Sequence, residues 1–265
     1  SIAENSNALS TVKIANDFKA SLQKGEIFLN YQPIVDLKTE KTSGFEALMR
    51  WNHPQHGFIS PDKFIPVIED NGFIQKASQW ALNTALDALR EMIDSSGNDA
   101  LFMSVNFSSL DFSADNFYDN IVGALTARHL KPENLHIEIT ESLLMGHPEK
   151  AKETLNACSS YGIGVSIDDF GTGYSSLSYK HYFPIHTLKI DLSFVKAMLE
   201  DKSMMEVVKA IVSLGKSMEM EIIAEGIETI EHADVLRALG CEMGQGYYYS
   251  RPLIKDDAKA FVTSR

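Results

Sequence analysis

The sequence has few cysteines, only Cys158 and Cys241 among its 265 residues. Small secreted domains usually carry an even set of closely spaced cysteines, whereas isolated cysteines are typical of proteins kept in a reducing compartment. We therefore expect two buried free thiols in an intracellular protein. A disulfide between the two cysteines is the alternative.

Long apolar runs are also missing. No stretch approaches the ~18 apolar residues of a membrane-spanning helix. Residues 1–5 have neither the basic region nor the apolar stretch of a signal peptide. Because the chain begins without a methionine, we expect a processed chain or a fragment of a longer protein. These absences predict a cytoplasmic chain, either free or as the cytoplasmic portion of a larger, membrane-anchored protein.

Positive charge is scarce in this sequence. The 24 Lys and Arg residues stand against 36 Asp and Glu residues, which gives a formal net charge of −12. Because binding to nucleic-acid phosphates or to an anionic membrane needs a positive surface, the charge argues against both. Hydrophobic residues make up 44% of the chain and charged residues 23%. This composition is typical of a globular protein and excludes a fully disordered chain.

Short β-type runs alternate with longer helical patterns. Strands are expected at 28–36, 44–51, 101–107, 135–140, 164–170, 187–191, 221–225 and 246–250, and helices at about 61–93, 114–129, 148–161, 203–218, 229–239 and 255–263. The connection 37–43 is long enough only for a hairpin-like return, so the first strand should be antiparallel to the second. Eight strands with interleaved helices predict an α/β fold, a (β/α)8 TIM-like barrel with one antiparallel strand near its start. An open doubly wound sheet is the alternative, although no glycine-rich phosphate-binding fingerprint follows any strand.

Residues 1–20 are expected to form a helical or linker segment before a single domain over 21–265. Apolar residues at spacings of three and four predict one buried helix face, formed by Leu9, Val12, Ala15, Phe18 and Leu22. Such a helix either caps the domain or ends a connecting helix from an upstream domain.

Polar residues gather at the carboxyl ends of the predicted strands, where the active sites of such barrels lie. They are Glu46, Arg50, Asn106, Glu138, Glu141, Asp168, Asp169, Lys189, Asp191, Glu225, Glu228 and Gln245. Each alone has a structural explanation, such as a strand-end ion pair or an acid in the first turn of a helix. Together, their like charges would repel one another unless a cation lay among them. Oxygen ligands in this number predict Mg²⁺ or Mn²⁺, and no Cys or His set suits tetrahedral zinc.

Eight ordered motifs resemble those of the EAL-domain family, bacterial phosphodiesterases of the second messenger cyclic di-GMP. They are YQPIVDL (31–37), FEALMRW (45–51), SVNFS (104–108), EITES (138–142), DDFGTGYSSLSY (168–179), LKIDLSFV (188–195), AEGIET (224–229) and QGYYYSRP (245–252). The resemblance covers the chain from residue 20 to residue 260. It implies a (β/α)8-like barrel and metal-assisted hydrolysis of one phosphodiester bond, which gives linear pGpG.

The resemblance also implies roles for residues of this sequence. The metal ligands would be Glu46, Asn106, Glu138, Asp168, Asp169 and Glu225, with Asp168 bridging two ions. Catalysis would involve Asp169, Lys189, Glu225 and Glu228. Substrate would be bound by Gln32, Arg50, Asp191 and Gln245. Glu141 would anchor the loop 170–176, which in this family is coupled to dimerisation.

The expected cofactors are therefore two Mg²⁺ or Mn²⁺ ions, and the expected ligand is cyclic di-GMP. Ca²⁺ should inhibit, because it prefers longer bonds and more ligands than Mg²⁺. A homodimer and an upstream sensory or GGDEF domain are further expectations from the resemblance.

Two other functions remain open from the sequence. One is a catalytically silent EAL domain that acts as a cyclic di-GMP receptor, and the other is an unrelated metal-dependent barrel hydrolase. Silent receptors usually lose catalytic acids or the DDFGTGYSS loop, whereas both are intact here. The sequence therefore favours an active phosphodiesterase.

Overall fold

A computed structural model of the chain describes residues 2–141, 148–171 and 182–264. Its barrel strands are β1 (Ile27–Asp36), β2 (Thr42–His53), β4 (Phe102–Asn106), β5 (Leu135–Thr140), β6 (Gly164–Phe170), β7 (Thr187–Ile190), β8 (Glu221–Ala224) and β9 (Met243–Gly244). They follow one another as β1-β9-β8-β7-β6-β5-β4-β2, and pairing of β1 with β2 closes the barrel. β1 is antiparallel to both of its neighbours, and the other barrel pairs are parallel. The predicted closed barrel with one antiparallel strand is confirmed, and the open sheet is excluded.

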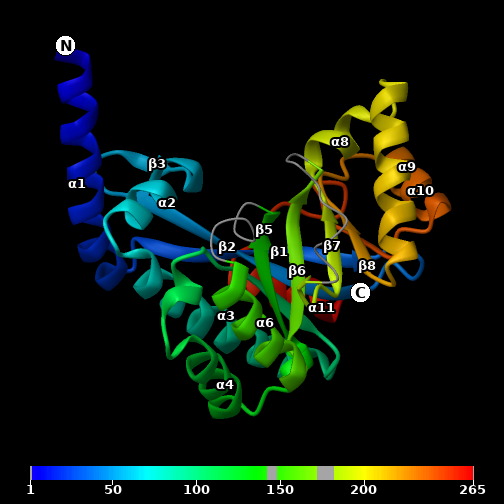
Figure 1. Ribbon diagram of the computed structural model, residues 1–265, viewed down its shortest axis with the longest axis horizontal. Coiled ribbons are helices and arrows are strands. Elements are labelled where there is room, and N and C mark those ends of the chain that lie inside the picture. Colours follow the sequence, from blue (N-terminus) through cyan, green and yellow to red (C-terminus); the bar gives the residue numbers. More distant parts are fainter. Residues whose placement is uncertain (1, 142–147, 172–181, 265) are drawn as a thin grey trace.

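Helices surround these strands (Figure 1). They are α1 (Ile2–Lys24), α2 (Pro61–Asp70), α3 (Ile74–Ser96), α4 (Phe117–Ala127), α6 (Pro148–Tyr161), α8 (Leu192–Ala197), α9 (Lys202–Ser217), α10 (Ile230–Leu239) and α11 (Lys255–Thr263). α3 shows why they pack there: its buried residues recur at spacings of three and four, as in Ala81, Leu82, Ala85, Leu86 and Leu89. This spacing gives a helix one apolar stripe to bury against the strands.

The predicted helix over 61–93 is two helices, because the chain turns at 71–73. Gly72 has a φ of 71°, a left-handed conformation that glycine adopts readily. Asn71 ends the first helix by donating its side-chain amide to the carbonyl oxygen of Val67. Beyond the break, α2 lines a cavity beside Asn106 and Asp168 at the strand ends, whereas α3 packs against β1, β2 and β4.

The prediction of a strand at 246–250 is wrong. The eighth barrel strand is β9, and residues 247–249 form a turn. A Cβ atom on Gly246 would lie 2.1 Å from the carbonyl oxygen of Ile227, so this close backbone packing requires glycine. The tyrosines that follow favour strands by composition alone, but packing against the loop after β8 overrides that preference.

The α1 helix is attached to the barrel through a small aromatic cluster. The ring of Phe18 lies 5.5 Å from that of Trp51 in β2 and 5.9 Å from that of Phe64 in α2. Ala15 and Phe18 are buried as predicted, whereas the side chains of residues 9 and 12 lie outside the described set. A short strand that was not predicted, β3 (Gly57–Ile59), pairs with the end of β2 beside α1 (Figure 1).

Both cysteines are buried and free, as predicted. Over the ranges that the structure describes, no helix is both long enough and apolar enough to cross a membrane.

Candidate active site

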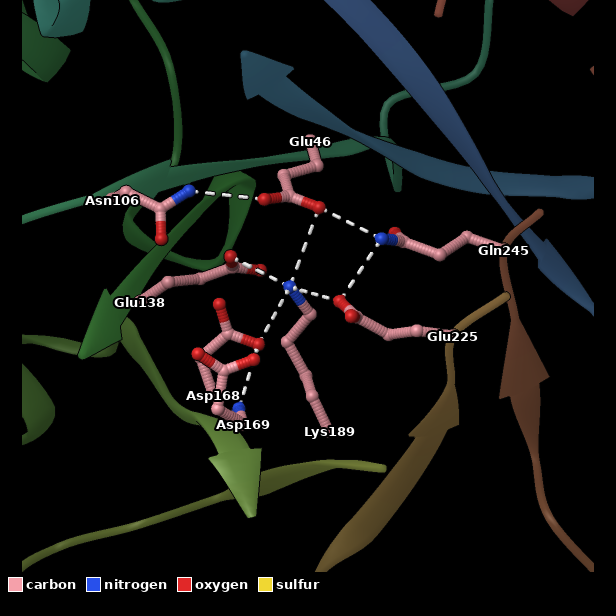
Figure 2. A network of polar contacts seen from close by, with 8 residues as sticks. All are labelled: Glu46, Asn106, Glu138, Asp168, Asp169, Lys189, Glu225 and Gln245. Atoms are coloured by element: carbon pink, nitrogen blue, oxygen red, sulfur yellow. Dashed lines mark hydrogen bonds and ion pairs between the residues drawn. The ribbon is translucent and has the colours of Figure 1, made fainter. Parts of the chain in front are cut away.

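Lys189 lies at the centre of a ring of carboxylates at the carboxyl end of the barrel (Figure 2). Its Nζ atom is 2.7 Å from Glu225, 2.8 Å from Glu138, and 3.3 Å from Glu46 and Asp168. The lysine is fully buried, and so is Glu138. Strands β2, β5 and β6 and the end of β8 supply the acids, and β7 supplies the lysine. We call these five residues the carboxylate ring.

Two side-chain amides orient the ring. Asn106 Nδ2 donates to Glu46 Oε1 at 3.0 Å. Gln245 Nε2 donates to Glu46 Oε2 at 2.8 Å and to Glu225 Oε1 at 3.1 Å. Because Asn106 uses its amide hydrogens here, its carbonyl oxygen remains available to a cation. The structure thus brings Asn106 and Gln245 to the same place as the acids, as the sequence predicted.

The acids of the ring outnumber its single ammonium group. Burial and the nearby charges of Glu46 and Asp168 raise the pKa of Glu138 well above its usual range. Burial also raises the pKa of Glu225 to about 8, despite the contact with Lys189. Burial opposes ionisation of Glu46 as well, but Lys189 and the two amides keep the pKa of Glu46 below its usual value. The ring is therefore short of positive charge, and a cation would stabilise it.

Two overlapping groups of carboxylates have the spacing of a metal site. Oxygen atoms of Glu46, Glu138 and Asp168 lie within 4.8 Å of one another, and so do oxygen atoms of Asp168, Asp169 and Glu225. Within the described residues, Glu138 Oε1 is buried without a hydrogen-bond donor, which is costly unless a cation binds it. The residues present therefore fit divalent cations that prefer oxygen ligands, with Asp168 shared between two positions.

A β-bulge brings both Asp168 and Asp169 to the site. Adjacent residues of a regular strand point to opposite faces, so only one of the two should face the ring. The pairing of β6 with β7 shifts register between Ile167 and Phe170, and Asp169 has a φ of 54°, unusual for a residue other than glycine. Burial and the charges of Asp168 and Asp191 raise the pKa of Asp169 to about 6. Backbone strain of this kind is common at functional sites.

The residues predicted to bind substrate surround the ring. Gln32 is buried, and its Nε2 atom donates to the carbonyl oxygen of Ser250 at 2.6 Å. Arg50 is half-buried and donates to the carbonyl oxygen of Met49 at 2.9 Å. Asp191 accepts the backbone N–H of Ser193 at 2.9 Å and thereby caps α8.

Two predicted residues lie farther from the ring. Glu228 is exposed and forms an ion pair with Lys196 at 2.7 Å. Glu141 is buried at the end of β5. Its predicted partner is the loop 170–176, of which residues 172–176 lie outside the described part of the chain. The predicted roles of Glu228 and Glu141 therefore stay predictions.

Two cavities adjoin the ring and share Arg50 and Asp168 in their walls. The larger, of about 700 Å³, extends between the ring and α2, whose Ile65, Pro66 and Glu69 line it. The smaller, of about 280 Å³, is lined by other residues, among them Gln32, Glu46, Lys196, Glu225, Glu228 and Tyr247. The α2 residues were not predicted as part of a site. In the sequence, only the pair Asn71-Gly72 indicates that the helix breaks here and that α2 can take a direction different from that of α3.

Comparisons with known proteins identify the family of the chain. The EAL domain family model matches residues 15–252. The chain is 37% identical over 258 residues to the bifunctional diguanylate cyclase/cyclic di-GMP phosphodiesterase MucR of Pseudomonas aeruginosa. The aligned region covers 97% of this chain and 38% of MucR. The chain thus spans less than two fifths of the length of MucR and of two further curated relatives that it matches.

Solved structures show the same fold. The MucR phosphodiesterase in complex with c-di-GMP is 37% identical, with a TM-score of 0.87 over 93% of this chain and 99% of that one. The EAL enzyme Bd1971, bound to cAMP and cyclic-di-GMP, is 39% identical, with a TM-score of 0.93 over 98% of this chain and 71% of that one. The motifs, the closed barrel and these matches lead to one conclusion: the chain belongs to the EAL domain family.

Proposed function

We propose that this chain hydrolyses cyclic di-GMP to linear pGpG with the help of two Mg²⁺ or Mn²⁺ ions. The observation that carries the proposal is the carboxylate ring, in which two overlapping groups of acids share Asp168. Cyclic di-GMP is the proposed substrate because MucR is named as its phosphodiesterase and because its structure holds that ligand.

The side chains around the ring have separate tasks in this reaction. Bound divalent ions supply Lewis acidity, which activates the attacking water and offsets negative charge on the phosphate. Lys189 adds a fixed positive charge at the centre of the ring. Arg50 lines both cavities, and its planar guanidinium group can hold two phosphate oxygens at once. Asp169 lies in one group with Asp168 and Glu225, where its carboxylate can position the attacking water.

An assay of metal dependence tests the proposal. Cyclic di-GMP is incubated with the chain and Mg²⁺, Mn²⁺ or a chelator, and the products are separated by chromatography. We expect pGpG only when a divalent ion is present. Binding of cyclic di-GMP without turnover under every metal condition would overturn the proposed activity and favour the silent receptor.

Ca²⁺ is expected to inhibit hydrolysis. It prefers about 6–8 ligands at roughly 2.3–2.6 Å, against about 2.0–2.1 Å for Mg²⁺, so it should occupy the same oxygens but activate water poorly. Rates are measured with Mg²⁺ alone, with Ca²⁺ alone, and with Ca²⁺ added to the Mg²⁺ enzyme. Equal rates with the two ions would contradict the expectation.

Metal affinity is expected to rise with pH between about 5 and 9. Burial raises the pKa of Glu225 to about 8, and that of Asp169 is about 6. Both groups must lose their protons before they bind a cation, so protons compete with the metal at low pH and are released on binding. Calorimetric titration of Mn²⁺ in buffers of different ionisation enthalpy counts the protons released. An affinity that does not change with pH would show that these acids are not ligands.

The family resemblance further leads us to propose a homodimer and an upstream regulatory domain. Sedimentation of this chain with and without cyclic di-GMP tests the first of these proposals.

A further inference from the structure

The helix α2 contacts α1 on one side and the larger cavity on another. Ile65 and Glu69 of α2 line the cavity, whereas Phe64 and Ile68 lie on a different face of the helix and are fully buried. α2 packs against α1, and the two helices lie side by side in Figure 1. The position of α2 therefore decides where this wall of the cavity lies.

Three aromatic rings join α1 to α2. Phe18 of α1 is 1% exposed, and its ring centroid lies 5.5 Å from that of Trp51 in β2 and 5.9 Å from that of Phe64 in α2. The rings of Trp51 and Phe64 lie 5.6 Å apart, with an angle of 88° between their planes. Stacked and edge-to-face pairs of this kind stabilise beyond the apolar area that they bury. Phe18 thus joins α1 both to a barrel strand and to α2.

α2 has little stability of its own. It has ten residues, Pro61–Asp70, and isolated helices shorter than about 12–15 residues are marginal in water. Pro66, inside the helix, has no N–H group to donate to the carbonyl oxygen of Asp62. Ser60 precedes the helix, but within the part of the chain that the structure describes its side chain makes no capping hydrogen bond. α2 is therefore held in place by packing against α1, β2 and α3.

We propose that Phe18 is a positioning residue for substrate binding, which holds α2 and, through α2, the wall of the larger cavity. Its ring packs on Phe64, one residue before Ile65 in that wall. Its second partner, Trp51, follows Arg50, which lines the cavity from β2. The carboxylate ring is built on strands, so its geometry should depend little on Phe18. The proposal takes cyclic di-GMP as the substrate and in this respect rests on the proposed function.

A general structural role is the competing explanation. Any large residue of the core stabilises the fold, and its truncation lowers the melting temperature. A positioning role makes two narrower predictions: the loss of protection is confined to α2, and the change in kinetics is confined to substrate binding. Ile121 provides a matched control, because it is also 1% exposed but lies on α4.

Hydrogen exchange followed by mass spectrometry tests the first prediction without any ligand. In Phe18→Ala, the amides of residues 64–70 should exchange about tenfold faster or more, because a lost core contact makes local opening of α2 easier. The amides of β5 and β7, which carry Glu138 and Lys189, should keep their rates. Phe18→Leu refills most of the space and should restore most of the protection. Ile121→Ala should leave the exchange of α2 unchanged.

Steady-state kinetics below the unfolding temperature test the second prediction. In Phe18→Ala we expect the KM for cyclic di-GMP to rise about tenfold while kcat stays within about twofold of the wild type, as when a binding contact alone is lost. Phe18→Leu should lie close to the wild type, and Ile121→Ala should change neither constant. The apparent affinity for Mg²⁺ should be the same in all four proteins, because the carboxylate ring is intact in each.

Three results would overturn the proposal. They are α2 amides that exchange at the wild-type rate in Phe18→Ala, a fall in kcat at unchanged KM, and equal effects of Phe18→Ala and Ile121→Ala. Failure of the proposed function is a separate result, in which the wild type does not hydrolyse cyclic di-GMP. The exchange of α2 then still decides whether Phe18 holds the cavity wall, and calorimetric Kd values for cyclic di-GMP replace KM.

Discussion

Glu46→Ala should reduce hydrolysis of cyclic di-GMP by about 10²-fold or more, the effect typical of losing one catalytic group. Glu46 contacts Lys189 and accepts hydrogen bonds from the amides of Asn106 and Gln245. Alanine removes one carboxylate from the group formed with Glu138 and Asp168. It also removes the acceptor of the exposed Asn106 amide and one of the two acceptors of the buried Gln245 amide, which still donates to Glu225. We therefore expect weaker metal binding and a less well-ordered carboxylate ring.

The measurement is turnover as a function of Mg²⁺ concentration, together with a calorimetric titration of the metal. Glu46→Gln separates the two effects, because it is nearly isosteric and loses the charge while one amide oxygen remains as an acceptor. Glu91→Ala is a control for surface acids: Glu91 pairs with Lys255 and Lys259 on the outside of the barrel, and its loss should leave turnover unchanged. Retention of more than a tenth of wild-type turnover by Glu46→Ala at moderate Mg²⁺ would exclude Glu46 as a metal ligand.

The sequence predicted the barrel because parallel strands buried on both faces have a simple signature. In β5 and β6, apolar residues lead up to acids at the strand ends, and helical patterns follow. β9 lacks this signature, since only two residues pair. Its position is set by the close contact between Gly246 and Ile227, which are distant in sequence. Tertiary contacts of this kind cannot be seen in local composition.

The candidate site was predictable to the extent that it lies at strand ends. Glu46, Asn106, Glu138 and Lys189 come from regular strands, so their meeting follows from the barrel itself. That Asp168 and Asp169 both reach the site was not predictable from strand periodicity, because it depends on a bulge. Glu69 was missed for a different reason: it lies on a helix whose direction is set by the turn at 71–73.

Asp169→Asn should separate binding from chemistry. Asn is nearly isosteric and tolerates the left-handed backbone conformation at this position, so the fold should survive. The affinity for cyclic di-GMP should come largely from Arg50, Gln32 and Asp191 and from the packing of its bases, none of which the change removes. We therefore expect Kd to rise by less than about tenfold, or 1.4 kcal/mol.

The rate should respond very differently. Asp169 forms a group with Asp168 and Glu225 in which oxygen atoms lie within 4.8 Å, and asparagine can neither accept a proton nor offset the charge of a cation there. An interaction that matters mainly in the transition state appears as a fall in kcat without a matching rise in Kd. We expect a loss of about 10²-fold or more in kcat. Calorimetric titration of cyclic di-GMP in the presence of Ca²⁺ measures Kd. Turnover in the presence of Mg²⁺ measures kcat. If affinity and rate fall by the same factor, Asp169 acts in ground-state binding, and the role proposed for it in positioning water is wrong.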